Sequence, residues 1–466
     1  MRLLLTTVPQ RISEKRTEPM GIPCLSIYVL AAAARNAGHP TTLLDPCKYT
    51  KLIRKEDYLE CCVQLLLQKI EESGAEAIGF SANTFLWPEV RLLTKLLKER
   101  RPEIQILIGG MHPTLFPEHT LRISGADVVI RGEGEHTLPK VLDALERGQE
   151  LSLVPGITYR TKEGICSNPD APELTLEEME AEPYPAYDLI PEANPYRMIP
   201  VESSRGCMYS CAFCSIPHRH NWRGLSEKTV GKRMEYALRY QKQLQMGDIF
   251  LFVDDCFSAD GERATAILQY MGSLNEGRQK AYLEFRFTDV LRTPILQRIE
   301  PGQIFTIQFG VECGYEEGLL RIKKGLTMKQ LFAGLDLLKA CHLEEVSFLS
   351  FIIGFPWETR EEVFKTIDTI EEIVANYRVI CNLNWLIFLP SDLWKEREQY
   401  GIDVDESVFD ETFWNSNPDV FFRTHPRIQR QDVLDVDERI RNICYRKHYR
   451  GQLAYRRAFL LDEERS

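Results

Sequence analysis

The chain has 466 residues, of which 44% are hydrophobic and 27% charged, and its formal net charge is -11. Its length predicts two or three domains with separate cores, and its acidic balance gives no reason to expect nucleic acid as a partner. Pro9 and Arg11 interrupt the N-terminal apolar run too early for a secretory signal, and no run of about 18 apolar residues predicts a transmembrane segment. We expect a multidomain cytoplasmic protein.

Residues 1–148 alternate short apolar runs with longer amphipathic segments, which predicts an α/β domain with a parallel, Rossmann-like sheet. The expected strands span residues 3–8, 41–45, 77–81, 105–109 and 127–131. The expected helices span residues 26–36, 57–73, 88–100 and 137–147. Several strands end in glycine, proline or small polar residues, at the edge where parallel sheets bind ligands.

Residues 149–195 differ in composition from the domain before them. They contain seven prolines and an acidic run from Glu173 to Glu182. This composition predicts a linker, with a small hairpin around residues 156–167.

A second strand and helix series occupies residues 196–394, with expected strands at 199–203, 248–253, 282–287, 304–311, 345–353 and 379–389. Six parallel strands with helices between them predict a partial (β/α)6 barrel of TIM type, whose chemistry lies at the carboxyl ends of the strands. Residues 395–466 lack this pattern, and we expect a small, mainly helical C-terminal cap or lid.

Three of the thirteen cysteines, Cys207, Cys211 and Cys214, lie within eight residues as C-x3-C-x2-C directly after the first strand of this second series. Three thiolates can ligate three irons of a four-iron cluster and leave the fourth iron open, and an open iron can chelate a small molecule. The alternatives are a chance grouping or a zinc site completed by His218 or His220, although zinc sites usually combine C-x2-C pairs.

This segment resembles the signature of the radical S-adenosylmethionine (SAM) superfamily, C-x3-C-x-aromatic-C, in which Phe213 is the aromatic residue. The resemblance implies an oxygen-sensitive [4Fe–4S] cluster on the three cysteines, with SAM bound to the open iron and Phe213 packed near its adenine. It also implies an external electron donor of flavodoxin or ferredoxin type. Reductive cleavage of SAM then yields methionine and a 5'-deoxyadenosyl radical.

Further segments resemble the family in the same order along the strands: 252–257, 284–286, 309–314 and 351–358. The resemblance implies that they contribute SAM contacts from Asp254, Asp255, Arg286, Glu312 and Gly354. Each of these residues is also compatible with a structural ion pair or turn. Cys313 departs from the serine common at its position, and its thiol is either a hydrogen-atom donor or a small buried residue.

Residues 1–150 resemble the cobalamin-binding domain that precedes the barrel in one large subgroup of the superfamily. The resemblance implies cobalamin contacts in the loops after three strands, from Ser81, Asn83, Thr84, Gly109, Gly110, Gly132 and Glu133. Glycine lets the backbone approach a bulky ligand, and hydroxyl or amide groups can hydrogen-bond the corrin amides. The alternative is a Rossmann-like domain with another ligand or none. The D-x-H-x-x-G motif of methionine-synthase-like cobalamin domains, which supplies a histidine ligand to the lower face of the corrin, is absent. We therefore expect no protein histidine to ligate the cobalt from that face.

Cobalamin beside a radical generator implies a methyltransferase that uses a 5'-deoxyadenosyl radical and methylcobalamin on an unactivated carbon or phosphorus centre. The family alternative is a cobalamin-dependent cyclisation or rearrangement without methyl transfer. An alternative of another class is a non-catalytic iron–sulfur electron carrier or scaffold. We expect a small-molecule or natural-product substrate, which no feature of the sequence specifies further.

Overall fold

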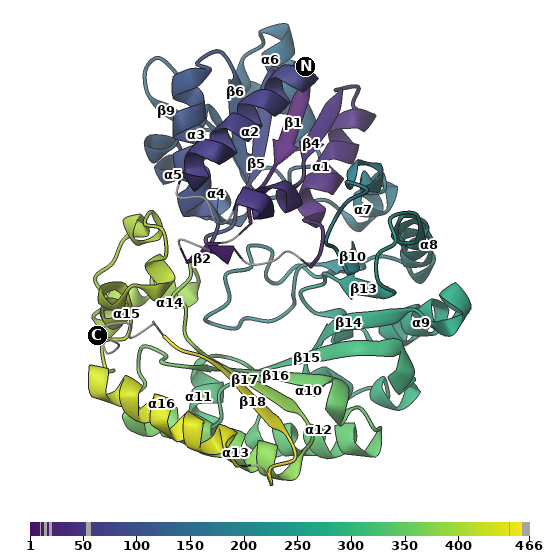
Figure 1. The fold of residues 1–466 in the computed structure, drawn as a ribbon, viewed down its shortest axis with the longest axis vertical. Coiled ribbons are helices and arrows are strands. Elements are labelled where there is room, and N and C mark those ends of the chain that lie inside the picture. Colours follow the sequence, from purple (N-terminus) through teal and green to yellow (C-terminus); the bar gives the residue numbers. More distant parts are fainter. Residues whose placement is uncertain (10, 14–15, 18–20, 53–56, 447, 459–466) are drawn as a thin grey trace. The chain divides into compact units, whose positions relative to one another are not determined.

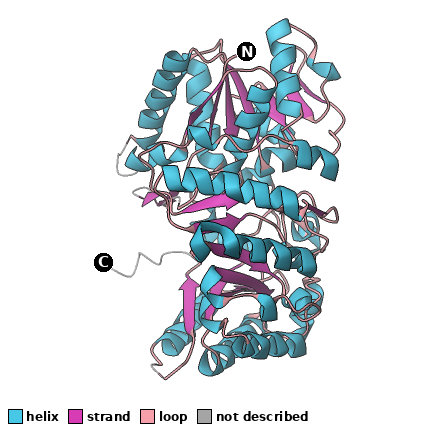
Figure 2. Cartoon of the chain, turned by 90° about the vertical axis from the view of Figure 1, so that its right-hand side faces the viewer, coloured by secondary structure: helices cyan, strands magenta, loops and turns pink. Residues whose placement is uncertain are grey.

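The described residues form two compact units and two seven-stranded sheets (Figure 1). The computed structural model describes residues 1–9, 11–13, 16–17, 21–52, 57–446 and 448–458. The first unit comprises Met1–Pro200, Tyr236–Gly247 and Glu406–Trp414. The second comprises Val201–Glu235, Asp248–Asp405 and the described residues from Asn415 onward. Figure 2 shows helices flanking the strands in both units.

The first sheet has the strand order β4-β1-β5-β6-β7-β8-β9. The five strands predicted from the sequence pair in parallel, and the predicted hairpin, β8 and β9, extends the sheet antiparallel. In sheet order, the strands are Thr41–Leu44, Leu3–Thr6, Ala77–Ser81, Gln105–Gly109, Val128–Ile130, Ile157–Arg160 and Ile165–Ser167. The segment predicted to be a linker therefore extends the first sheet.

The strands of the first sheet are short and apolar on both faces, and helices bury both faces. α2 packs beside α3, and α1 packs beside α6. The sequence predicts all four of these helices, but not the short α4 and α5. Their bounds are α1 Leu25–Asn36, α2 Tyr58–Ser73, α3 Trp87–Arg100, α4 Met111–Leu115, α5 Pro117–Ile123 and α6 Thr137–Arg147. The strand order reverses between β1 and β5, and such switch points are where open sheets bind ligands.

The second sheet has the order β10-β13-β14-β15-β16-β17-β18, and its pairs from β13 onward are parallel. All six predicted strands are present, and β18 adds a seventh from the C-terminal region. They span Met198–Val201, Ile249–Phe252, Lys280–Phe285, Ile304–Glu312, Ser347–Ile353, Ile380–Trp385 and Gln452–Arg456. The longer helices are α8 Glu227–Gln243, α9 Gly261–Ser273, α12 Met328–Ala340, α13 Arg360–Asn376 and α16 Arg430–Cys444.

The second sheet has one buried face and one accessible face. Along β16, Leu349 and Phe351 are fully buried, whereas Ser350 and Ile352, which alternate with them, are half-buried. A closed barrel would fill its interior with side chains, but this open sheet leaves one face available to a ligand. Among the residues that the structure describes, no helix is long and apolar enough to cross a bilayer.

Residues 406–414, which we call the Phe409 strap, come from the C-terminal region but belong to the first unit. The Phe409 ring is fully buried, with its centroid 6.0 Å from that of His112. Burial lowers the pKa of His112 to about 3, so its neutral ring packs as an aromatic residue 4.7 Å from Trp87. The Trp87 indole nitrogen donates a 2.8 Å hydrogen bond to Asp410.

The expected cap at residues 395–466 is thus not one separate element. The Phe409 strap joins the first unit because its aromatic side chain is buried there, whereas α16 and β18 belong to the second unit. Residues 459–466 of the expected cap lie outside the described part of the chain.

We expect Phe409→Ala to lower the free energy of unfolding of the first unit by about 3 kcal/mol, because it removes a fully buried ring and leaves a cavity. Chemical denaturation followed by tryptophan fluorescence measures this change. Phe305 is 43% exposed, so Phe305→Ala is the matched control, with an expected change within about 0.5 kcal/mol. Equal stabilities of the Phe409→Ala protein and the wild type would contradict the prediction.

Candidate functional site

The three clustered cysteines lie on a loop that a short antiparallel ladder closes at its base. The ladder pairs β11 (Ser204–Arg205) with β12 (Arg223–Gly224). Gly206 begins the loop with φ +80°, and a Cβ at this position would clash with the carbonyl oxygen of Asn221. Glycine is therefore required where the chain turns into the cysteine loop.

Backbone hydrogen bonds hold the loop in shape. His220 N donates to Cys207 O at 2.6 Å, and Cys214 N donates to Cys211 O at 3.1 Å. Ala212 N donates at 3.0 Å to the carbonyl oxygen of Ile322, which lies in the turn after α11 (Glu316–Arg321). The structure therefore keeps the three cysteines on one ordered loop.

Arg286, which is one of the predicted site residues, lies against this loop. Its Nη1 is 3.5 Å from Cys211 Sγ, and its guanidinium carbon lies 3.6 Å from the Tyr209 ring centroid. Its Nη2 donates to the Lys324 carbonyl oxygen. Its Nε is buried and has no hydrogen-bond partner among the described residues. This unpaired cationic donor fits an anionic group bound at the cysteines.

The chemistry of the thiols also fits a metal cluster. Burial raises the pKa of Cys214 to about 11 and the pKa of Cys207 above its usual value, although the charge of Arg286 partly lowers the latter. Binding of a metal would lower the pKa values of Cys207 and Cys214 and hold both as thiolates at neutral pH. No three His, Cys, Asp or Glu side chains in the described ranges are placed to hold a single metal ion. Four irons space their sulfur ligands more widely than one ion does.

The two predicted aspartates have different surroundings at the end of β13. Asp254 is 2% exposed and accepts hydrogen bonds from the hydroxyls of Ser203 and Ser204, the former at 2.7 Å. Burial raises its pKa to about 6. Asp255 accepts a 3.1 Å hydrogen bond from Gly206 N. Both carboxyl groups thus support the start of the cysteine loop, and Asp255 is the more accessible of the two.

The aromatic residue of the cysteine motif contacts the loop after β16. The Phe213 ring lies 6.1 Å from the Phe355 ring in an edge arrangement. Gly354 has φ +83°, and a Cβ on it would lie 2.6 Å from the His425 ring. The Glu358 carboxylate accepts hydrogen bonds from Gly354 N at 2.7 Å and Phe355 N at 3.0 Å. Glu358 therefore shapes the turn that meets Phe213.

Glu358 and Tyr315 were not among the predicted site residues. The Tyr315 hydroxyl donates a 3.0 Å hydrogen bond to Glu358, and burial raises the pKa of Glu358 to about 7. The signal that identifies Glu358 was in the sequence, since it ends the segment 351–358. Cys313 is fully buried beside Thr366, and burial raises its pKa to about 12, which matches a small core residue.

In the first unit, the predicted cobalamin contact Ser81 lies at the switch point between β1 and β5. The Ser81 hydroxyl lies 3.0 Å from the Ser26 hydroxyl, and Thr7 donates a 2.7 Å hydrogen bond to Ser81 O. Ser81 and Gly109 are register partners on β5 and β6. The sequence prediction omits Thr7 and Ser26, which the switch-point rule would have found once the strand order was known.

Gly110 is required by the local backbone. It has φ +104° and ψ -171°, and a Cβ there would lie 2.5 Å from the Ala82 carbonyl oxygen. Gly132 has φ +71° and open space around its Cβ position. Gly110 thus brings the loop after β6 close to the loop after β5, whereas Gly132 leaves space beside the loop after β7.

Three other predicted cobalamin contacts are engaged inside the protein. Asn83 Oδ1 accepts hydrogen bonds from Phe85 N and Leu86 N, both at 3.0 Å, at the start of α3. Thr84 is 3% exposed. Glu133 accepts a 2.6 Å hydrogen bond from Leu174 N. In the structure, these three residues shape the loops that follow the strands. A direct contact of any of them with cobalamin would form only when the cofactor binds.

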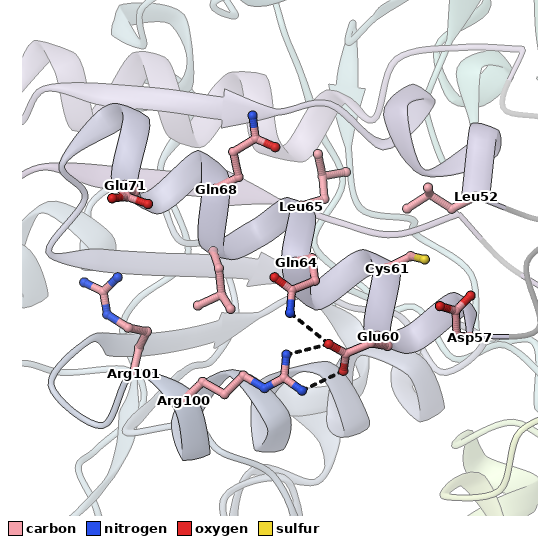
Figure 3. Close-up of a pocket in the computed structure, with 11 residues that line it drawn as sticks. Leu52, Asp57, Glu60, Cys61, Gln64, Leu65, Gln68, Glu71, Arg100 and Arg101 are labelled. Atoms are coloured by element: carbon pink, nitrogen blue, oxygen red, sulfur yellow. Dashed lines mark hydrogen bonds and ion pairs between the residues drawn. The ribbon is translucent and has the colours of Figure 1, made fainter.

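A hollow of about 640 Å³ lies elsewhere on the first unit, along α2 and the end of α3 (Figure 3). Arg100 donates hydrogen bonds of 2.7 and 2.6 Å to the two carboxylate oxygens of Glu60, and this pair lowers the pKa of Glu60 to about 2. None of the predicted cofactor residues lines this hollow. It is therefore separate from the site.

Family models match both units. Residues 21–142 match the B12 binding domain, and residues 201–370 match the radical SAM superfamily. The order of the two matches is the order predicted from the sequence. Together they imply cobalamin, SAM and a [4Fe–4S] cluster as cofactors, which confirms the predicted set.

The chain is similar to an uncharacterized methyltransferase of Pyrococcus horikoshii, at 28% identity over 81% of this chain and 79% of that protein. It is 30% identical to an anaerobic magnesium-protoporphyrin IX monomethyl ester cyclase of Synechocystis, over 46% of this chain but only 42% of the cyclase.

A solved structure has a similar fold. It is the cobalamin-dependent SAM radical enzyme OxsB with aqua-cobalamin and SAM bound, at a TM-score of 0.66 and 21% identity. The similarity covers 88% of this chain and 56% of that one. The chain is a member of the radical SAM superfamily, with a B12-binding domain ahead of its radical SAM domain.

Proposed function

We propose that the chain is a cobalamin-dependent radical SAM methyltransferase that acts on an unactivated carbon or phosphorus centre. The observation that carries the proposal is that one chain holds both a cysteine loop with an unpaired cationic donor and a switch-point site in a B12-binding domain. The similarity to a protein named as a methyltransferase over most of both chains supports it.

The proposed reaction balances without other reactants. A substrate C–H or P–H bond, two SAM molecules and two electrons give the methylated substrate, S-adenosylhomocysteine, methionine and 5'-deoxyadenosine. The hydrogen lost by the substrate ends in 5'-deoxyadenosine, and the methyl group comes from the SAM that becomes S-adenosylhomocysteine. The bound cofactors supply the radical and methyl-transfer chemistry.

The protein's own groups would bind and orient these cofactors. We propose Cys207, Cys211 and Cys214 as the cluster ligands, with Arg286 offsetting the negative charge of the cluster. Phe213 would pack against adenine, and the Glu312 carboxylate would accept hydrogen bonds from ribose hydroxyls. Asp255 and Gly354 complete the proposed SAM contacts, and Asp254 supports the loop beside them.

The proposed cobalamin site uses Ser81, Gly109, Gly110 and Gly132 for direct contact. Asn83, Thr84 and Glu133 remain proposed contacts whose present hydrogen bonds or burial position the same loops. The electrons would come from a flavodoxin or ferredoxin, and the substrate would be a small molecule or natural product. Because thiolate ligands require reduced cysteines, we also propose that the chain works in the cytoplasm.

Labelled SAM tests the reaction. We expect anaerobic turnover of candidate metabolites with hydroxocobalamin, reductant and SAM carrying a trideuterated methyl group to yield a product that contains the intact label. S-adenosylhomocysteine and 5'-deoxyadenosine should form in equal amounts, and mass spectrometry detects both. Turnover of a substrate without S-adenosylhomocysteine or label would refute methyl transfer.

The second candidate is a cyclisation or rearrangement without methyl transfer, favoured by the 30% identity to the magnesium-protoporphyrin cyclase. It predicts 5'-deoxyadenosine without S-adenosylhomocysteine. A non-catalytic electron carrier predicts no SAM cleavage after reduction. The same product analysis therefore separates all three.

A further inference from the structure

Lys324 joins three parts of the proposed SAM and cluster site. It lies in the turn 322–325 that follows α11, where Lys323 and Gly325 have φ of +55° and +68°. The Ile322 carbonyl oxygen of this turn accepts the 3.0 Å hydrogen bond from Ala212 in the cysteine loop. The Lys324 carbonyl oxygen accepts from Arg286, the residue beside Cys211. One short turn thus contacts the cysteine loop and its neighbouring cation.

The Lys324 side chain makes the third connection. Its Nζ lies 3.1 Å from Glu312 Oε1, and the two side chains are 8% and 9% exposed. Glu312 ends β15 with φ +73°, a left-handed conformation that is costly for a residue other than glycine. The pairing between β15 and β16 shifts its register at the same place. The strained backbone and the ion pair together direct the Glu312 carboxylate.

Gly310 is part of this arrangement. A Cβ on Gly310 would clash with Glu312 Oε1 and lie 2.7 Å from Lys324 Nζ. The ion pair therefore lies directly over the Gly310 backbone, where any larger residue would displace it. Glycine at this position is explained by the close approach of the pair.

Other acidic groups lie near the ion pair, and Lys324 partly offsets their negative charge. Burial raises the pKa of Glu284 to about 7, and the negative charges of Asp255 and Glu312 add to this effect, whereas Lys324 opposes it. A buried ion pair gains little stability over apolar packing, but removing one partner leaves the other charge uncompensated. Because apolar packing could replace the whole pair, stability alone does not explain its presence, and the carboxylate that Lys324 orients does.

We propose that Lys324 is a positioning residue for SAM, whose ammonium group holds Glu312 ready for the ribose hydroxyls while its backbone holds Arg286 at the cysteine loop. The inference rests on the proposed SAM contact of Glu312. A carboxylate accepts several hydrogen bonds, so its contact with Lys324 leaves acceptor capacity for ribose. The same turn then links SAM binding to the geometry of the cluster loop.

Substitution of the side chain alone tests the proposal, because it spares the backbone contacts. We expect Lys324→Met in the reconstituted holoenzyme to bind SAM about tenfold more weakly or worse, since Glu312 loses its partner. Iron and sulfide contents should match the wild type. Isothermal titration measures the affinity, and the SAM-induced change in the electron paramagnetic resonance spectrum of the reduced cluster should require proportionally more SAM.

The controls separate positioning from folding. Lys323→Met removes the same charge from the exposed neighbouring residue and should leave SAM affinity unchanged. Lys324→Arg should recover part of the affinity, because it restores a cation beside Glu312. If Lys324→Met does not fold, Lys324→Gln is the second neutral variant. For SAM cleavage, KM should rise more than kcat falls.

Each outcome has a distinct meaning. Weakened SAM binding by Glu312→Gln together with unchanged binding by Lys324→Met would overturn the role of Lys324 and leave the Glu312 contact standing. Unchanged binding by Glu312→Gln would overturn the proposed Glu312 contact itself. Loss of the cluster in Lys324→Met would also overturn the proposal, because it would make the side chain a support of the cysteine loop.

Discussion

Changing Cys207, Cys211 and Cys214 together to alanine is expected to remove both the visible absorbance of the iron–sulfur cluster and all cleavage of SAM. The three thiols are the proposed ligands, and the triple variant keeps none of the sulfurs that would anchor the cluster. Anaerobic reconstitution with iron and sulfide, followed by absorption spectroscopy, metal analysis and assay of 5'-deoxyadenosine, measures both losses.

A second triple variant controls for the number of cysteines removed. Cys166, Cys341 and Cys444 lie away from the cysteine loop in sequence, and each is at least partly exposed. Their joint replacement by alanine should leave cluster content and SAM cleavage at the wild-type level. A full cluster and normal turnover in the Cys207, Cys211 and Cys214 variant would remove the central assignment.

Gly110→Ala is expected to weaken the binding of hydroxocobalamin by about tenfold or more, since the substitution adds a backbone penalty of roughly 1–3 kcal/mol and moves a loop of the proposed corrin site. The conformation of Gly110 is nearly exclusive to glycine, and a Cβ would meet the Ala82 carbonyl oxygen at 2.5 Å. Titration under anaerobic conditions, monitored by the corrin spectrum, gives the affinity and should show one cobalamin per wild-type chain.

Gly148→Ala is the matched control, because Gly148 also has a positive φ, +61°, but has open space around its Cβ position. It ends α6 and is not a predicted cobalamin contact. We expect a small loss of stability and unchanged cobalamin affinity. Equal affinities of the Gly110→Ala and Gly148→Ala proteins would show that the loop after β6 does not shape the site, whereas no binding by the wild type would defeat the cobalamin assignment.

The cysteine loop is the part of the candidate site that the local sequence predicts best. The spacing of Cys207, Cys211 and Cys214 indicates cluster chemistry without any fold, because three ligands on one short loop need little help from distant residues. Arg286 was also predicted, from its strand. Its contact with Cys211 and its unpaired Nε appear only when β14 is placed beside that loop.

Other predicted site residues changed their role once their neighbours were known. Asp254 is held by two serines, and Asn83 is used to start α3. Sequence pattern identifies a polar group at a strand end, but not whether another part of the chain already satisfies it. Ser26 was missed because its partner, Ser81, comes from another segment of the chain. Glu358, in contrast, ends a segment that the sequence already indicated.

The sequence by itself determined the order of the main strands and helices, the α/β class and the cysteine spacing, because apolar periodicity and short motifs are local properties. Only the tertiary structure decided that β18 extends the second sheet, that the Phe409 strap belongs to the first unit and that Lys324 pairs with Glu312 over Gly310. These features join segments far apart along the chain, and their free energy comes from burial and charge pairing that exist only after folding.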